Sequence, residues 1–592
     1  MLTKYKHLLL NKLSNKKSPH LFVSQPATGE LPDNVVTSLT ELPFEIEKIL
    51  FLDEHEQIGM SIDDIDNFLF IKSKKHSDRN KAYILQSAQA NPDSLQALCQ
   101  YKYEIIQKTE YKYTKTHIVS PNVIRRVYEN YNKHSSLSQS DLVNYFDGIL
   151  TSAINQNASD IHIKVMQDSA DVSFRVHGEI IHHSRHDAEH MHKMILSVYN
   201  GQGAEGQKDQ QFDLGEKQQT IIERHINNRM YRIRFMSSKI VAESNDDLHK
   251  RYYIVALRLL SSDASAIKNI HDLGYTEMQL ESLRRVSLAP SGGIIFSGTT
   301  GSGKSTSLAG LIIEILSYSK GKKKIISVES PVEYVINGVD QLVVHESAGM
   351  SEEEITEEFN KALKALMRLD PDIIYCNEIR NSTTALFSQK AIQSGHLFLS
   401  TVHAQSALGV IERLARIEMD LDLLCSIGFI QLVVHQTLIQ NSCQYCSKKI
   451  SDLEITEKNS LKHLIERIEK VVDTYSLPEN SLQKIRFRND SGCNQCNQTG
   501  VSGRTVVAEM LLPNIEILKL IREKRTVDAY NAWRNHGFNT ILEHAISKLF
   551  HGEICPLALE SKLGFIDSDI NKENLTKQKY KEIYSKLVGS DT

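Results

Sequence analysis

The segment Gly298–Ser305 fits the pattern G-x-x-x-x-G-K-[ST], whose residue types and spacing suit the binding of nucleotide phosphates. Its glycines permit a tight turn whose backbone N–H groups point into one concavity, where phosphate oxygens can accept hydrogen bonds. Lys304 can reach the β- and γ-phosphates, and the Ser305 hydroxyl can be a ligand of Mg²⁺. The pattern predicts a nucleoside triphosphate site. Its predicted binding residues are Gly298, Thr299, Thr300, Gly301, Ser302, Gly303, Lys304, Ser305 and Thr306.

Two elements must hold this loop in place. Residues 293–297 (GIIFS) predict a short buried strand before the loop, and residues 307–316 (SLAGLIIEIL) predict an apolar helix after it. Backbone donors converge on phosphate where a strand, a glycine-rich turn and a helix N-terminus follow one another. A glycine-rich turn that fits the pattern by chance would not account for this strand and this helix.

Hydrolysis also needs a carboxylate that positions water, a Mg²⁺ ligand and positive charge for the transition state. Candidates stand at the ends of three further predicted strands: Glu333, Glu378, and the pair His396 and His403 on either side of the third strand. Alone, each is more often a solvated or structural residue. Their order behind one phosphate loop, at strand ends where α/β sheets place ligands, favours a functional interpretation. These strands are predicted at 324–328, 372–375 and 397–402.

Together these blocks resemble the four nucleotide-site motifs of the secretion-ATPase superfamily. That family powers type IV pilus assembly and retraction and type II secretion, and it has more distant relatives in type IV secretion. The resemblance covers roughly residues 140 to 565. The family's Walker A box matches Gly298–Ser305 and its aspartate box matches Val328–Glu333. Its atypical Walker B box matches Asp372–Arg380, and its histidine box matches Gly395–His403. The two blocks that open the family's second N-terminal domain match Ala158–His162 and Phe174–Gly178.

This resemblance implies roles for the candidate residues. ATP is the expected nucleotide, Glu333 the general base that orients the attacking water, and Glu378 the residue that holds Mg²⁺ through its water shell; the two roles could be exchanged. His396 and His403 would sense or contact the γ-phosphate region. Arginines of the N-terminal sheet would bring positive charge to the phosphates, because a guanidinium forks onto phosphate oxygens and stays charged; the alternative is an exposed strand face. The matching arginines are Arg232, Arg234 and Arg258.

Several positions depart from the family pattern. Ser330 stands where the family usually has aspartate, Asn377 replaces a small glycine, and Asn381 and Thr384 replace acidic residues. None of these changes removes the Walker A lysine or either glutamate, so we expect hydrolysis to survive. They keep open the alternative of a nucleotide-gated scaffold that binds ATP and barely hydrolyses it.

Four of the eight cysteines form two C-x-x-C pairs. Each pair can place two thiolates on one turn, and two such turns complete a tetrahedral Zn²⁺ site. The alternatives are reduced buried cysteines or a redox pair. Assembly-type members of the resembled family often carry a tetracysteine metal site after the ATPase core, and retraction ATPases generally lack it. With all four positions filled by protein, the metal would be structural. The predicted ligands are Cys443, Cys446, Cys493 and Cys496.

The pattern along the chain predicts an α/β protein with a mostly parallel core sheet, preceded by a domain with an antiparallel sheet. Residues 42–52 could form a helix in a small first module, and Gly537 and Gly552 mark expected helix ends. The resemblance implies a P-loop (RecA-like) core and a PAS-like fold for the α+β domain before it. The expected regions are an N-terminal docking domain 1–115, a linker 116–139, the α+β domain 140–265, the ATPase domain 266–510 with the cysteine element 443–496, and a helical region 511–592.

The composition is that of an ordinary soluble protein, with 41% hydrophobic and 24% charged residues and a net charge of −4 over 592 residues. This charge gives no support for wholesale nucleic-acid binding, and none is expected. No stretch approaches 18 uninterrupted apolar residues, so we expect a cytoplasmic protein whose membrane role would be peripheral. The resemblance implies that this role lies at the cytoplasmic face of the inner membrane.

The resemblance therefore predicts a homohexameric ATPase that drives assembly of a type IV pilus or a type II secretion pseudopilus. Its expected partners are an inner-membrane platform protein and, through the docking domain, a cytoplasmic component of the membrane complex. The rival functions are a pilus retraction ATPase, a type IV secretion or DNA-transfer ATPase, and the scaffold described above.

Overall fold

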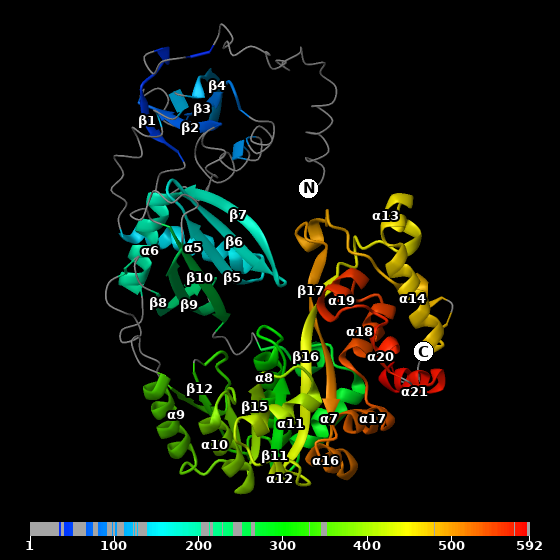
Figure 1. Ribbon diagram of the computed structural model, residues 1–592. Coiled ribbons are helices and arrows are strands. Elements are labelled where there is room, and N and C mark those ends of the chain that lie inside the picture. The colour runs from blue at the N-terminus through cyan, green and yellow to red at the C-terminus, as the bar shows by residue number, and fades with distance from the viewer. Residues whose placement is uncertain are drawn as a thin grey trace. The chain divides into compact units, whose positions relative to one another are not determined.

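The computed structural model divides the chain into two compact units, Met1–Asp141 with Ser184–His186 and Leu142–His183 with Asp187–Thr592 (Figure 1). Residues 1–34, the polar stretch 132–138 and Pro331 lie outside the described residues. Across the described part of the chain, no helix has the length and apolar character needed to cross a membrane. The described residues are 35–36, 41–50, 67–74, 81–90, 98, 101–102, 112–121, 123–124, 127, 139–202, 212–213, 217–227, 229–240, 252–261, 267–330, 332–344, 352–478, 480–573 and 575–588.

The first unit contains a four-stranded sheet in the order β1-β2-β3-β4, in which only β3 and β4 pair in parallel. Its core includes Val123 and Val127, which follow the last strand. The linker predicted from residue 116 therefore begins too early, because β4 and the buried residues after it belong to this unit. The strands are β1 (Ile46–Ile49), β2 (Phe68–Ser73), β3 (Lys81–Ser87) and β4 (Lys112–Val119).

The expected helix over 42–52 is wrong, because this segment contains strand β1. Leu42, Ile46 and Ile49 are all buried in the core of the first unit. This spacing of four and three residues is also that of one face of a helix. The register shifts between Ile46 and Lys48, so a β-bulge lets residues at an odd separation face the same core.

The second unit begins with helix α5 and a six-stranded antiparallel sheet in the order β7-β6-β5-β10-β9-β8. The antiparallel sheet predicted for this region is confirmed. Helix α6 packs against β5, β6 and β8. The elements are α5 (Gln139–Asn155), β5 (Ala158–Val165), β6 (Ser169–Val176), β7 (Glu179–Asp187), α6 (Ala188–Gln202), β8 (Gln218–Ile226), β9 (Arg229–Lys239) and β10 (Tyr253–Ser261).

The predicted α/β core is confirmed as a seven-stranded sheet in the order β13-β12-β14-β15-β11-β16-β17. Every pair is parallel except β16–β17. Two apolar clusters cover its two faces, one under α9, α10 and α11 and the other under α7 and α8. Its elements up to the last parallel strand are η4 (Ile270–Asp272), α7 (Glu277–Ser287), β11 (Gly292–Ser297), α8 (Lys304–Ser319), β12 (Ile325–Glu329), β13 (Val339–Val343), α9 (Glu352–Leu366), β14 (Ile373–Cys376), α10 (Ser382–Gln393), β15 (Leu397–Val402), α11 (Ala407–Arg416), α12 (Leu421–Leu424) and β16 (Ile430–Ser442).

The long strands β16 and β17 lie side by side as an antiparallel ribbon, drawn in yellow and orange in Figure 1. A helical insertion separates them in sequence and packs with the C-terminal helices in a third apolar cluster. The insertion and the closing strand comprise η5 (Ile450–Asp452), α13 (Ile455–Ser460), α14 (Lys462–Tyr475), α15 (Ser481–Lys484), η6 (Asn494–Cys496) and β17 (Val501–Leu511).

The chain after β17 is helical, as predicted. Gly537 and Gly552 follow the caps of α17 and α18 with φ values of 87° and 74°, so both predicted helix ends are confirmed. The fully buried Arg534 donates two hydrogen bonds of 2.7 Å to the Glu543 carboxylate, which joins these two helices. The helices are α16 (Ile515–Arg522), α17 (Thr526–Asn535), α18 (Ile541–Phe550), α19 (Pro556–Leu563), α20 (Ser568–Lys572) and α21 (Lys577–Val588).

Candidate functional site

The parallel register brings the predicted motifs to one edge of the core sheet. Ser297 lies opposite Val402, and Cys376 lies opposite both Val328 and Ser400. The carboxyl ends of β11, β12, β14 and β15 therefore meet at this edge, which is where α/β sheets hold their ligands. The phosphate loop, both glutamates and His403 all follow these strand ends.

The phosphate loop has the predicted setting, between a fully buried strand and a helix that begins at Lys304. The Lys304 ammonium crosses the loop and donates to the Gly298 carbonyl at 2.9 Å and the Thr299 carbonyl at 3.2 Å. Burial lowers the pKa of Lys304, while the carboxylates of Glu378 and Glu333 act to raise it. Both glutamates therefore lie within electrostatic reach of this lysine.

The Glu378 carboxylate lies between the side chains of Arg380 and His403. Arg380 donates from Nε to one carboxylate oxygen at 2.8 Å, and His403 Nε2 lies 3.2 Å from the other. His403 Nδ1 also lies 3.1 Å from the Gly298 carbonyl oxygen. Because a carbonyl and a carboxylate can only accept, both contacts are hydrogen bonds only when the imidazole is doubly protonated. In that form His403 places a positive charge between the phosphate loop and Glu378.

Glu333 lies on a loop that is tied to the rest of the site. The Gln341 amide donates to the Tyr334 carbonyl at 2.9 Å and to the Glu329 carboxylate at 2.8 Å. The Tyr334 hydroxyl in turn contacts the Thr306 hydroxyl at 2.9 Å. These contacts tie the residue that follows Glu333 to β13 and to the first turn of α8.

Glu329 is a buried carboxyl at the end of β12. Burial raises its pKa, although hydrogen bonds from Ser327 and Gln341 favour the carboxylate. Because it is enclosed and paired, Glu329 is suited to supporting the loop that carries Glu333.

The structure places His396 at the end of β15 that lies away from the phosphate loop. This residue precedes β15, and its carbonyl accepts from the Gly292 N–H at the amino end of β11. Its Nδ1 contacts the Ala391 carbonyl at 3.0 Å. The six residues of β15 separate its two ends by roughly 20 Å. His396 and His403 therefore lie at opposite edges of the sheet, and only His403 joins the site.

The predicted arginines lie on strands β9 and β10, where they pair within their own sheet. Arg232 donates to Glu223 at 2.9 Å, Arg258 donates to Asp160 at 2.9 Å, and Arg234 lies opposite Arg258 in the register. In the described part of the chain, none of the three donates a hydrogen bond to the phosphate loop. Their phosphate role stays a prediction.

The residues that depart from the family pattern have local partners. Asn381 and Thr384 cap the start of helix α10, because the side chain of each accepts a hydrogen bond from the backbone N–H of the other. An acidic side chain could accept the same bonds. The Ser330 hydroxyl donates to the Val344 carbonyl at 3.1 Å, and Asn377 accepts from the Tyr375 hydroxyl at 3.3 Å. These substitutions leave the backbone around both glutamates hydrogen-bonded.

The ribbon of β16 and β17 brings the two C-x-x-C pairs together, because Ser442 lies opposite Val501. The four sulfur atoms all lie within 4.8 Å of one another, and the closest pairs are 3.7 to 3.9 Å apart. Four sulfurs about 2.3 Å from a tetrahedral zinc ion would be separated by about 3.8 Å. The spacing of the four sulfur atoms therefore fits a tetrahedral metal site.

Backbone donors surround one of these thiols. Burial acts to raise the pKa of Cys496, but the N–H groups of Cys493 and Gly500 donate to its sulfur at 3.1 and 3.2 Å. The net effect lowers its pKa to about 6. Such donors stabilise a thiolate, which is the form that binds metal.

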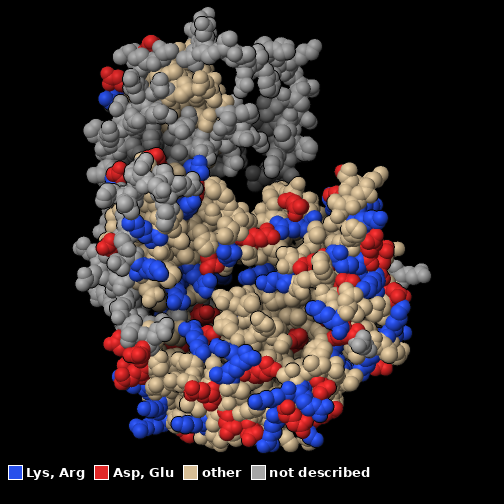
Figure 2. Space-filling model, viewed as in Figure 1, with Lys and Arg blue, Asp and Glu red and all other residues tan. Residues whose placement is uncertain are grey.

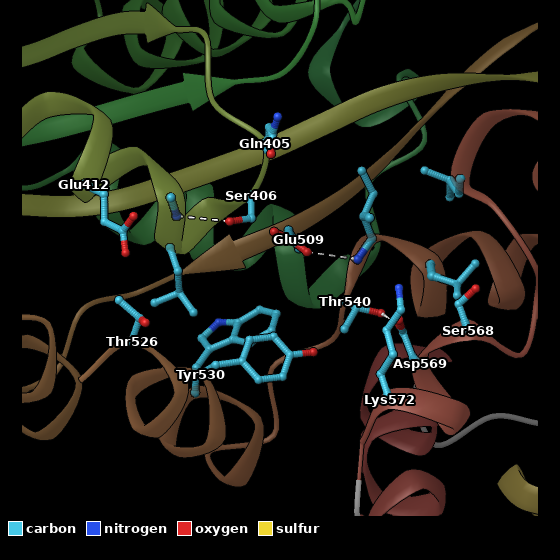
Figure 3. Close-up of a pocket in the computed structure, with 16 residues that line it drawn as sticks. Gln405, Ser406, Glu412, Glu509, Thr526, Tyr530, Thr540, Ser568, Asp569 and Lys572 are labelled. Carbon is cyan, nitrogen blue, oxygen red and sulfur yellow. Dashed lines mark hydrogen bonds between the residues drawn. The ribbon is translucent and has the colours of Figure 1, made fainter. Parts of the chain in front are cut away.

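A separate cavity of about 500 Å³ lies between the N-terminal ends of α11 and α18 (Figure 3). Glu509 of β17 accepts hydrogen bonds there from the backbone N–H groups of Ala407 at 2.8 Å and Ile541 at 3.2 Å. Close by, the Thr540 hydroxyl donates to Asp569 at 2.6 Å. Glu509 thus satisfies free donors at two helix ends, one of which follows the loop that carries His403.

Glu509 gives a pH-dependent prediction. Burial raises its pKa to about 7, although its two backbone bonds act in the opposite direction. As the pH rises from about 5 to about 8, the unfolded chain loses this proton before the folded chain does, so folding becomes less favourable. Glu509→Gln has no such proton. The free energy of unfolding of Glu509→Gln, relative to that of wild type, should therefore increase by about 2 to 3 kcal/mol between about pH 5 and about pH 8.

This change can be measured by urea unfolding at both pH values, followed by the fluorescence of Trp533, the chain's single tryptophan, which lines the same cavity. Glu412→Gln alters a half-exposed carboxylate of the same cavity and serves as the matched control. Equal pH dependence in wild type and Glu509→Gln would contradict the prediction.

Some residues of the site were not identified from the sequence. Tyr334 and Gln341 lie near Glu333, so a search for polar residues beside a candidate base could have found them. Gln436, which contacts the phosphate loop, is far away in sequence and carries no local motif.

Comparisons with known proteins identify a family and several relatives. A model of the family "Type II/IV secretion system protein" matches residues 136–563. The "Type IV pilus assembly ATPase PilB" of Thermus thermophilus is 28% identical over 70% of this chain and 42% of its own length. The "Type II secretion system ATPase E" of Vibrio cholerae is 27% identical over 65% of this chain and 67% of its own length.

Among solved structures, the ATPase DotB of Legionella pneumophila aligns with a TM-score of 0.49 and 18% identity, over 71% of this chain and 95% of that one. The chain spans less than half of the length of the Thermus relative described above.

Proposed function

Because the chain belongs to the type II/IV secretion system protein family, we propose that it is an ATPase motor that powers assembly of a type IV pilus or of a type II secretion pseudopilus. The observation that best supports hydrolysis is the convergence of Lys304, Glu333, Glu378 and His403 at one edge of the core sheet. This arrangement offers a phosphate cradle, two carboxylates and fixed positive charge in one place.

In the proposed reaction, the backbone N–H groups of the phosphate loop and Lys304 bind the phosphates. Glu333 orients the attacking water and takes its proton, while Glu378 holds Mg²⁺ through the water shell of the ion. Bound Mg²⁺ would neutralise charge on the phosphates. His403, held between Gly298 and Glu378, would sense the γ-phosphate, since its hydrogen bonds place it beside the loop.

The wider assembly is part of the proposal. We propose that the chain works as a homohexamer at the cytoplasmic face of the inner membrane, where it turns a platform protein that adds pilin subunits. Residues 140–265, proposed as a PAS-like domain, would close on the core when ATP binds and bring Arg232, Arg234 and Arg258 to the phosphates. The first unit would dock a cytoplasmic component of the membrane complex.

We also propose that the four cysteines hold a structural Zn²⁺, supported by their mutual distances. This element favours an assembly motor over a retraction motor. On the face drawn in Figure 2, basic and acidic side chains are interspersed over the described residues, which favours a protein machine over a DNA-transfer machine.

The test of this function is ATP turnover by the purified full-length chain with Mg²⁺ and with excess EDTA, each in the presence and absence of double-stranded DNA. We expect turnover that requires Mg²⁺ and is not stimulated by DNA. Stimulation by DNA would favour the DNA-transfer alternative, and tight ATP binding without Mg²⁺-dependent turnover would favour the scaffold.

The choice between assembly and retraction needs a cellular readout. Deletion of the gene should remove surface pili or block secretion if the chain is an assembly motor. Accumulation of excess pili would instead identify a retraction motor.

A further inference from the structure

Gln436 lies directly beneath the phosphate loop. It belongs to β16, is fully buried, and donates from Nε2 to the Ser302 carbonyl at 2.8 Å. A Cβ atom placed on Gly298 would come within 2.3 Å of the Gln436 backbone carbonyl, and one on Gly303 within 3.3 Å of Gln436 Nε2. Three residues of the phosphate loop therefore lie against Gln436, and two of them are glycines, whose lack of a side chain leaves room for Gln436.

Two hydroxyl groups fix which way the Gln436 amide faces. The Tyr275 hydroxyl lies within hydrogen-bond distance of both Gln436 Oε1 and, at 2.9 Å, the Ser307 hydroxyl. An amide oxygen can only accept, so the single phenol proton goes to Gln436 and Ser307 donates to Tyr275. With its oxygen held in this way, the amide must direct its N–H toward Ser302.

The bond to Ser302 sets the direction of a backbone donor. In a trans peptide the C=O of one residue and the N–H of the next point to opposite sides. Because Gln436 holds the Ser302 carbonyl toward β16, the Gly303 N–H points away from β16. Gly303 has φ of 84° and no Cβ, so without this bond the peptide could rotate at little steric cost. Phosphate binding in such a loop depends on N–H groups that already face the ligand.

We propose that Gln436 is a positioning residue of the nucleotide site, which keeps the Gly303 N–H directed at the phosphates of a bound nucleoside diphosphate or triphosphate. Tyr275 acts through it by fixing the orientation of the amide. The inference rests on the proposed nucleotide-binding function and adds to it a residue from outside the predicted motifs. Tyr275 also lies on the segment that enters the core after β10, so this segment is linked to the phosphate loop by two hydrogen bonds in series, from Tyr275 to Gln436 and from Gln436 to Ser302.

The test is calorimetric titration of the full-length chain with Mg²⁺-ADP. Gln436→Met keeps the length of the side chain but cannot donate to Ser302, and we expect it to weaken ADP binding on the order of 10-fold. Tyr275→Phe removes only the hydroxyl that orients the amide, and it should weaken binding about 3-fold. In both variants the number of ADP molecules bound per chain should stay at the wild-type value.

Thr437→Val is the matched control. It replaces the next side chain of the same buried strand, whose hydroxyl has no hydrogen-bond partner among the described residues. It should bind ADP as wild type does. A purely structural effect of Gln436→Met would lower the binding stoichiometry and the unfolding temperature together, whereas loss of positioning changes the affinity alone.

Wild-type affinity in folded Gln436→Met would overturn the proposal, and if that variant fails to fold, wild-type affinity in Tyr275→Phe would do so. A wild-type chain that binds ADP but does not hydrolyse ATP would refute the motor function and leave the positioning role intact. A wild-type chain that binds no nucleotide would refute both.

Discussion

Replacing Glu333 with glutamine is expected to lower Mg²⁺-dependent ATP turnover on the order of 10²-fold or more while ATP still binds. The amide keeps the size of the side chain but cannot take a proton from water. Glu333 lies on a loop that Gln341 and Tyr334 hold in place, so the substitution should change the chemistry and leave the backbone as it is. Steady-state turnover and equilibrium ATP binding, measured on the same preparation, check this result.

Glu378→Gln is expected to reduce turnover by a similar factor for a different reason. The variant weakens the bonds to Arg380 and His403 and removes a negative charge from the proposed Mg²⁺ position. A titration with Mg²⁺ separates the two roles. The variant at the metal position should need more Mg²⁺ for half-maximal turnover, and the variant at the base should not. The opposite pattern would exchange the assignments of the two glutamates.

Asp340→Asn provides the control for both variants, since it alters an exposed carboxylate on the edge strand β13. It should retain wild-type turnover. Wild-type turnover that is no faster than that of either glutamate variant would mean that Ser330 and Asn377 accompany a loss of hydrolysis. The scaffold function would then replace the motor.

The second large effect concerns the four cysteines. The purified chain should contain about one Zn²⁺, and Cys446→Ser should lose it, because three thiolates and a hydroxyl bind zinc far more weakly than four thiolates do. Structural zinc ions contribute on the order of 10 kcal/mol to the folding of small elements. Loss of the ion should therefore unfold the end of the β16–β17 ribbon, although the core sheet remains folded.

Zinc content by mass spectrometry and limited proteolysis between β16 and β17 measure this effect. Cys425→Ser is the matched control, because Cys425 lies outside the cluster and is partly exposed. It should keep its zinc and its resistance to protease. A wild-type chain without zinc, whose four cysteines are oxidised to disulfides, would contradict the metal assignment.

The parts of the fold that were predicted correctly are those in which local sequence determines the result. The phosphate loop, the apolar strands after it and the glycine helix ends carry period, composition and turn residues that no distant contact reverses. Strand β1 shows the limit of this approach. Its residues Ile46 and Ile49 have helical spacing, and only the bulge formed on pairing with β2 makes a strand compatible with their burial.

The candidate site was predicted in part for a similar reason. A motif places a residue in sequence but does not say at which end of its strand it lies, and this is why His396 and His403 were grouped although β15 separates them. Gln436 could not be found at all, because its contact with Ser302 depends on which strand lies next to β11. Strand order is a property of the whole sheet.

The metal cluster lies at the end of the β16–β17 ribbon, whose two strands are aligned by the hydrogen bonds between them. The segment 447–492 between the cysteine pairs does not take part in this strand pairing. Because the register of the two strands sets the positions of the four sulfurs, the turns within the insertion are free of that constraint, although its helices pack against the C-terminal helices. The same freedom makes the turn between α14 and α15 a suitable place to insert a fluorescent tag in living cells, at a site remote in sequence from every strand that carries the nucleotide motifs.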